Sequence, residues 1–136
     1  MECGIVPHTI FNIPYTIFHV TDLLTITDLE LWAHIGVPKE ERETEQRLLV
    51  TIEMSLDAKA AAKSDDVKKS INYVDVTGDL KKLAMTERKT IERFAEDAAQ
   101  MILKKHRPTS VTVTVKKFAV PGTESVSVRI TRTRTK

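Results

Sequence analysis

The chain has 136 residues and a mass of 15.4 kDa, which is the length of one domain, and its 41% hydrophobic and 29% charged residues are typical of a globular protein. Twenty-one basic and nineteen acidic residues give a formal net charge of +2, which is too balanced to make nucleic acid the expected partner. The single cysteine, Cys3, excludes an internal disulfide and fits a reducing compartment, so we expect a cytoplasmic protein.

Residues 1–21 are predicted to form an N-terminal extension to a domain that spans 22–136. The extension is apolar, but Pro7 and Pro14 interrupt it, Glu2 stands where a targeting peptide would carry a basic residue, and no apolar stretch reaches membrane length. We therefore expect no membrane association, and an arm that packs on its own domain or on a neighbouring subunit.

Two strands are predicted in the first half of the domain. Apolar and polar residues alternate over 29–35, and the alternation slips at 27–28, where a bulge is expected. A charged connection over 39–45 leads to the clearest alternation, over 48–56, so the two strands are expected to form an antiparallel hairpin. The next residues, 57–72, are polar and Ala-rich and contain a turn or helix-start signal.

Two helices follow. Apolar residues recur at helical spacing from about Val74, and a stronger apolar stripe runs over 91–103. Thr90 is the expected N-cap of the second helix, and the basic run 104–107 before Pro108 marks its end.

Two further strands close the domain, over 111–115 and 126–130, with a turn at 121–122. The order strand, strand, helix, helix, strand, strand predicts an α+β fold: a four-stranded antiparallel sheet with two helices on one face. The opposite face is expected to be polar, against bulk solvent or inside a hollow assembly. It would carry Thr51, Glu53, Ser55, Thr112 and Thr114.

Several kinds of chemistry lack their sequence signals. Only four glycines are present and none has the spacing of a phosphate-binding loop, and no Gly-x-Ser-x-Gly motif occurs. The four histidines lack the paired spacing of metal ligands; they are His8, His19, His34 and His106. We therefore expect neither a metal nor a cofactor, and periodicity alone leaves acid–base chemistry by carboxylates, a tyrosine and a lysine.

Five local clusters lie in register along the domain: His34-Ile35-Gly36-Val37, Glu41-Arg42 with Gln46, Asp65-Asp66 before Ile71-Asn72-Tyr73, Thr90 to Glu96, and Lys116 ahead of Ser125-Val126-Ser127-Val128. Taken together, they make the chain resemble the dihydroneopterin aldolase family between about residues 22 and 131. The resemblance implies the tunnelling fold, in which four sheets join into a barrel and two rings stack into a homo-octamer. It also implies active sites between adjacent subunits.

The reaction that the resemblance implies is retro-aldol cleavage of dihydroneopterin to hydroxymethyl-dihydropterin and glycolaldehyde in folate biosynthesis, without metal or Schiff base. Many members of the family also epimerise the side chain. Residues 72–77 and 125–127 are similar to dihydroneopterin triphosphate epimerase as well, and a triphosphate would need cations such as Arg42, Arg93 or Lys117. A non-catalytic pterin-binding protein of the same fold is the third alternative.

The substrate-binding residues implied by the resemblance are Glu92, Ile91, Val37 and Asn72. One carboxylate can accept the two parallel N–H donors on the edge of a pterin, and such charge-assisted bonds are about twice as strong as neutral ones. This is the implied role of Glu92, while Val37 would lend backbone contacts.

The implied catalytic residues are Lys116, Tyr73 and Glu41. Lys116 would relay protons through a bound water, although a one-residue slip to Lys117 stays open. Tyr73 would order the reacting hydroxyl, since a phenol can both donate and accept. Glu41 would stand near the reacting side chain, and Gln46 would position its loop.

Overall fold

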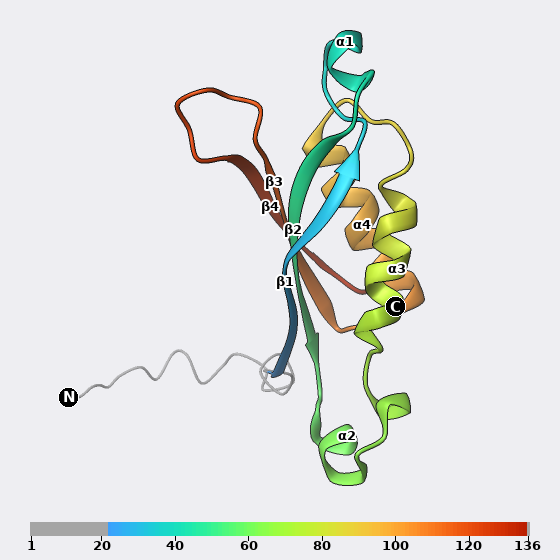
Figure 1. Ribbon diagram of the computed structural model, residues 1–136. Coiled ribbons are helices and arrows are strands. Elements are labelled where there is room, and N and C mark those ends of the chain that lie inside the picture. The colour runs from blue at the N-terminus through green and yellow to red at the C-terminus, as the bar shows by residue number, and fades with distance from the viewer. Residues whose placement is uncertain (1–21, 136) are drawn as a thin grey trace, which may run out of the picture.

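The computed structural model describes residues 22–135, so the predicted N-terminal extension lies outside the described residues. Four strands form one antiparallel sheet in the order of the chain: β1 (Asp22–Ala33), β2 (Gln46–Leu56), β3 (Ser110–Lys117) and β4 (Val126–Thr133). Helices α3 (Tyr73–Leu83) and α4 (Ile91–Lys105) cover one face of this sheet (Figure 1). The predicted α+β class and the predicted sheet are confirmed. Within residues 22–135, every helix is too short or too polar to cross a membrane.

The core lies between the helices and one face of the sheet. On β3, Val111, Val113 and Val115 are fully buried, while Thr112 and Thr114 point to the other, partly exposed face. Helix α4 contributes the largest apolar surface, and its buried residues follow the predicted stripe: Ile91, Phe94, Ala95, Ala98, Ala99, Ile102 and Leu103. Burying a large apolar side chain contributes about 1.5–3 kcal/mol, so this stripe holds α4 on the sheet.

Local signals in the sequence have the expected structural consequences. The register of β1 against β2 shifts between Ile26 and Leu29, which confirms the predicted bulge. Asp28 adopts a positive φ of 53°, and its backbone N–H donates to Thr51 Oγ1 at 3.0 Å. The Thr90 hydroxyl accepts a hydrogen bond from the backbone N–H of Arg93 at 3.1 Å, so Thr90 caps α4 as predicted.

Three short helices were not predicted: α1 (Lys39–Arg42), α2 (Lys59–Ser64) and η3 (Val67–Lys69). None of them buries a residue, so they carry no apolar periodicity from which to predict a helix. The helix α1 matters most because it carries Glu41, and a backbone hydrogen bond of 3.1 Å from Glu41 N–H to Pro38 O begins its single turn.

The molecule is elongated, and its two ends are used as landmarks below. At one end, which we call the α1 end, β1 finishes, β2 begins and β3 finishes, as the pairs Ala33–Gln46 and Leu48–Lys117 show. The other end, which we call the α2 end, holds the last residues of β2, the helix α2 and the start of α3 (Figure 1).

Candidate active site

An ion pair between Lys117 and Glu41 lies at the α1 end. Lys117 Nζ is 2.7 Å from Glu41 Oε2, and the exposed fractions of the two side chains are only 16% and 28%. The side-chain amide of Gln46 donates to the same Glu41 oxygen at 3.1 Å and to the carbonyl of Ile35 at 2.7 Å. The Glu41 carboxylate is thus held between an ammonium group and an amide that is itself anchored to the backbone.

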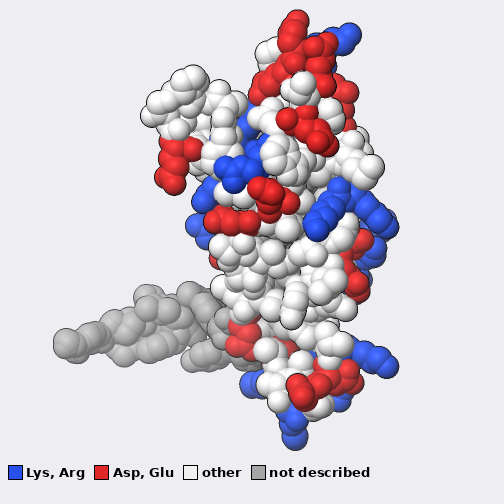
Figure 2. Space-filling model, viewed as in Figure 1, with Lys and Arg blue, Asp and Glu red and all other residues white. Residues whose placement is uncertain are grey.

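The pKa of Glu41 is lowered from its ordinary value. The largest cause is the hydrogen bond from Lys117; burial raises the pKa in opposition, and the hydrogen bond from Gln46 lowers it further. Glu41 is therefore a carboxylate at neutral pH. Acidic side chains crowd around α1, where Glu40 accompanies Glu41 in the first turn (Figure 2).

The structure brings Lys117, and not Lys116, to Glu41. Lys116 pairs with Leu49 across the strands and lies on the polar face of the sheet, where its Nζ is 3.6 Å from Asp28 Oδ1. Side chains alternate along a strand, so Lys117 shares the face of the buried Val115 and Lys116 cannot. The signal in the sequence that distinguishes the two lysines is therefore their position in this alternation: Lys117 is two residues from Val115, and Lys116 is one.

Glu92 and Val37 also lie at the α1 end. Glu92 is an exposed residue in the first turn of α4, and it has no ion-pair or hydrogen-bond partner among residues 22–135. Val37 is 67% exposed between β1 and α1. Ile91 lies beside Glu92, but its side chain belongs to the core, so only its backbone is placed to meet a ligand.

Gly36 permits the close packing of Glu41 against the chain. Gly36 has a φ of 155°, and a Cβ atom at this position would overlap the carboxylate of Glu41. A residue with a side chain at position 36 would therefore displace Glu41 from Lys117 and Gln46.

Tyr73 and Asn72 lie at the α2 end. Asn72 is the N-cap of α3, and its side-chain oxygen accepts from the Val74 N–H at 3.0 Å. Tyr73 is the first residue of α3 and is 55% exposed. The start of α3 and the helix α1 lie toward opposite ends of the molecule, so the structure does not bring Tyr73 and Lys117 together within one chain (Figure 1).

An ionic cluster fastens the Tyr73-bearing helix α3 to the end of α4. Asp79 on α3 accepts from Lys105 Nζ at 2.8 Å and lies 2.7 Å from His106 Nε2. The hydrogen bond from Lys105 is the largest cause that lowers the pKa of Asp79; burial opposes it, and the contact with His106 adds to the lowering. The cluster thus fixes the place at which Tyr73 emerges.

The cations considered for a triphosphate all have partners within the chain. The Arg42 guanidinium binds Glu87 and two backbone carbonyls, Lys117 binds Glu41, and Arg93 Nε lies 3.1 Å from Asp97. Of the three, Arg93 keeps the most exposed side chain, at 71%, and only its Nε is used by Asp97.

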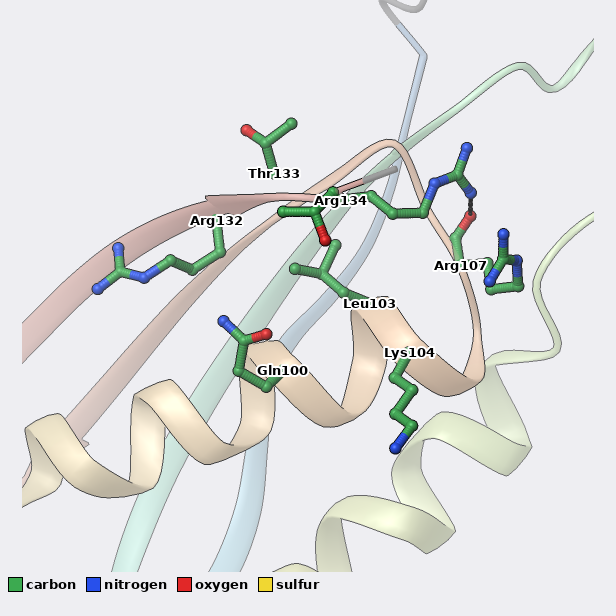
Figure 3. Close-up of a pocket in the computed structure, with 8 residues that line it drawn as sticks. Gln100, Leu103, Lys104, Arg107, Arg132, Thr133 and Arg134 are labelled. Carbon is green, nitrogen blue, oxygen red and sulfur yellow. Dashed lines mark hydrogen bonds between the residues drawn. The ribbon is translucent and has the colours of Figure 1, made fainter.

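Three surface hollows among the described residues lie away from these residues. One of about 490 Å³ lies between the end of α4 and β4 (Figure 3), one of about 390 Å³ beside the loop before α4, and one of about 430 Å³ between α3 and α4. None of the three is lined by Glu41, Lys117, Tyr73 or Glu92.

The four-stranded antiparallel sheet with two helices on one face matches solved structures of the tunnelling fold. A family model described as FolB, dihydroneopterin aldolase, matches residues 24–131. The chain belongs to the dihydroneopterin aldolase family.

Individual relatives agree with the family match. The chain is 34% identical over 113 residues to dihydroneopterin aldolase of Escherichia coli K12, which covers 82% of this chain and 93% of the relative. The crystal structure of a FolB protein from Vibrio cholerae matches with a TM-score of 0.81 at 32% identity, over 83% of this chain and 98% of the other. The E. coli dihydroneopterin aldolase, solved in complex with neopterin, matches with a TM-score of 0.79 at 33% identity, over 82% and 99% of the two chains.

Proposed function

We propose that this chain is a dihydroneopterin aldolase of folate biosynthesis, with epimerisation of the same substrate as a secondary reaction. The observation that carries the proposal is the Lys117–Glu41 contact of 2.7 Å, oriented by Gln46, at the end of the sheet where α4 begins with an unpartnered carboxylate. Relatives at about one-third identity are dihydroneopterin aldolases, and one of them binds neopterin.

Glu92 is the proposed anchor of the pterin ring. Its carboxylate is exposed and unpartnered among residues 22–135, so both oxygens are free to accept the two parallel N–H donors of a pterin. The exposed residue Val37 and the amide groups at the first turn of α4 would border the same ring. The pterin would thereby be held with its side chain directed toward Lys117.

Lys117 is the proposed proton carrier, in place of Lys116. In the retro-aldol step the hydroxyl on the second side-chain carbon loses a proton and its carbon becomes the aldehyde of glycolaldehyde. The bond between the first two side-chain carbons breaks, and its electron pair moves into the pterin ring as an enol. Through a bound water, the charged Glu41 would take the hydroxyl proton and the Lys117 ammonium would donate a proton to the first carbon; the proton on Glu41 would then pass to the Lys117 amine beside it, which restores both groups.

Tyr73 is proposed to reach this site from a neighbouring copy of the chain. It lies at the α2 end of its own chain and is 55% exposed, so its phenol is available to a partner. We therefore propose a homo-oligomer, such as the four-membered ring or octamer of the tunnelling fold, with the site shared between copies. A mass measurement in solution tests this directly, since a monomer would leave the site without Tyr73.

A product assay separates the aldolase from the epimerase. The purified protein is incubated with 7,8-dihydroneopterin and, separately, with its triphosphate, and glycolaldehyde and epimer are measured. We expect glycolaldehyde from the unphosphorylated substrate, because Arg42, Arg93 and Lys117 already have partners in the chain. Turnover that yields only epimer would overturn the aldolase proposal.

The proposed compartment is the cytoplasm. A chain with a single cysteine cannot use an internal disulfide, so it gains nothing from an oxidising environment. Fractionation of cells that express a tagged chain tests this placement, and recovery in the soluble cytoplasmic fraction is expected.

A further inference from the structure

The side chain of Arg42 joins three segments at the α1 end. Its Nε donates to the carboxylate of Glu87, in the loop before α4. Its Nη1 donates to the carbonyl of Gly36 at 2.9 Å and to that of Val37 at 2.8 Å. Only 14% of this side chain is exposed, although α1 is a surface helix with no fully buried residue. A guanidinium group presents several donors in one rigid plane, which suits it to such a junction.

The backbone reinforces the same junction. His34 Nδ1 lies 2.7 Å from the carbonyl oxygen of Arg42, and since a carbonyl can only accept, Nδ1 carries the proton. The backbone N–H of Arg88 donates to the His34 carbonyl, and the N–H of Gly36 donates to the Arg88 carbonyl, both at 3.1 Å. The end of β1, the helix α1 and the loop 86–88 are therefore tied to one another by main chain and side chain.

Each of the three segments leads to a group of the proposed site. The helix α1 carries Glu41, the turn after β1 carries Val37, and the loop 86–88 runs into the first turn of α4 with Glu92. We propose that Arg42 is a positioning residue that fixes the distance between Glu92 and the Glu41–Lys117 pair. This inference rests on the proposed function, because it concerns the spacing of that site.

A positioning role of Arg42 would affect ligand preference, whereas a purely structural role would not. A ligand that touches both Glu92 and the Glu41–Lys117 pair is sensitive to their separation, whereas a ligand that touches Glu92 alone is not. Neopterin carries the side chain that reaches the pair; unsubstituted pterin carries only the ring. Misplacing a reacting group by about 1 Å can lower a rate by about a hundredfold, so small changes in this junction should be measurable.

The test compares the binding of the two ligands. Neopterin and unsubstituted pterin are titrated, by their fluorescence, into the wild-type oligomer, Arg42→Gln and Arg42→Lys. We expect the preference for neopterin over pterin to fall about tenfold in Arg42→Gln and less in Arg42→Lys, with kcat/KM for dihydroneopterin falling about tenfold to a hundredfold.

Arg132→Gln is the matched control. Arg132 also binds one carboxylate, that of Glu96, at 2.8–2.9 Å and one carbonyl, that of Thr131, at 2.9 Å, but it joins β4 to the middle of α4. The substitution Arg132→Gln removes the same charge and the same kinds of bonds at a different place in the fold, so the ligand preference should stay as in the wild type.

Two results would overturn the inference. One is a ligand preference in Arg42→Gln equal to that in Arg132→Gln; the other is an equal loss of both ligands that follows only the fall in melting temperature. If Arg42→Gln does not fold, Glu87→Ala removes one partner from the surface and leaves both carbonyl bonds, and a smaller shift of the same sign is expected. A wild-type protein that prefers neopterin but releases no glycolaldehyde would count against the proposed function and leave the role of Arg42 testable.

Discussion

The two ends of the molecule present their polar groups in opposite ways. At the α1 end, Glu41 and Lys117 are mostly buried and Gln46 holds the carboxylate from a second side. At the α2 end, Tyr73 is more than half exposed and has only Asn72 of the predicted site residues beside it, while Asp79 fastens the helix α3 to the end of α4. The polar groups at the α1 end are thus held by contacts within the chain, whereas Tyr73 at the α2 end is exposed on the surface.

This difference fits the roles proposed above for the residues at the two ends. Acid–base groups work best when their geometry is fixed before the substrate arrives, and the contacts around Glu41 supply that fixation. A phenol that completes the site from another copy must instead be accessible on its own chain, and the helix that carries it must be held in place. The Asp79 cluster holds the helix α3 in place.

Replacing Lys117 should have the largest effect on activity. Lys117→Met removes the proposed proton carrier, so kcat for glycolaldehyde release should fall about 10²- to 10⁴-fold. Lys116→Met, on the opposite face of the sheet, should change kcat by less than about threefold, because its partner is Asp28 and not Glu41. Steady-state kinetics of the two variants decides between the lysines, and the reverse order of effects would reject the assignment.

Replacing Glu92 should affect binding more than chemistry. Glu92→Ala removes the acceptor proposed for the pterin ring, and hydrogen bonds to a charged group contribute about 1.5–3 kcal/mol, so the Kd of neopterin should rise about 10- to 100-fold. Fluorescence titration measures this. A Kd within twofold of the wild-type value, in a folded variant, would remove Glu92 from the ring-binding site.

At the α2 end, Asp79→Ala should lower stability before it lowers activity. It leaves His106 and Lys105 without their carboxylate, which should cost about 1–3 kcal/mol of the free energy of unfolding, measured in urea at neutral pH. Since the pKa of Asp79 is lowered in the folded state, this stabilisation is present above the ordinary pKa of aspartate and is lost as the pH falls through the lowered value. A difference between wild type and variant that persists or grows as the pH falls well below the ordinary pKa of aspartate would contradict the role given to the cluster.

Glu41 should show the smallest effect on stability, with the same sign. Lys117 lowers the pKa of Glu41, so the wild type should exceed Glu41→Gln in unfolding free energy by about 1 kcal/mol or less above the ordinary glutamate pKa. The difference should vanish as the pH falls through the lowered value. Urea unfolding at a series of pH values checks this; a pH-independent difference would mean that the charge of Glu41 does not matter to the fold.

Regular elements could be predicted because their burial is periodic. The alternation on 48–56 and 111–115 and the apolar stripe of α4 each reflect one face turned to the same core. The bulge at Asp28 could be predicted for the same reason, since an extra residue shifts the phase of the pattern. The resemblance to the family then supplied the positions of the polar groups.

The remaining features depend on contacts that no local pattern encodes. The helix α1 has four residues and buries none of them, so its charged sequence reads as a loop. The pairing of Glu41 with Lys117 joins residues 76 positions apart. The only sequence signal for Lys117 is that it continues the alternate positions of the buried valines on β3. The three contacts of Arg42 likewise depend on how three separate segments meet.

The most direct test of the shared site mixes two inactive chains. Lys117→Met retains Tyr73, and Tyr73→Phe retains Lys117; each alone should release little glycolaldehyde. When the two are co-expressed in equal amounts, random assembly places an intact Lys117 opposite an intact Tyr73 in about a quarter of the sites. We predict that about a quarter of wild-type activity returns, whereas no gain over the separate variants, in oligomers shown to contain both chains, would contradict a site built from two copies.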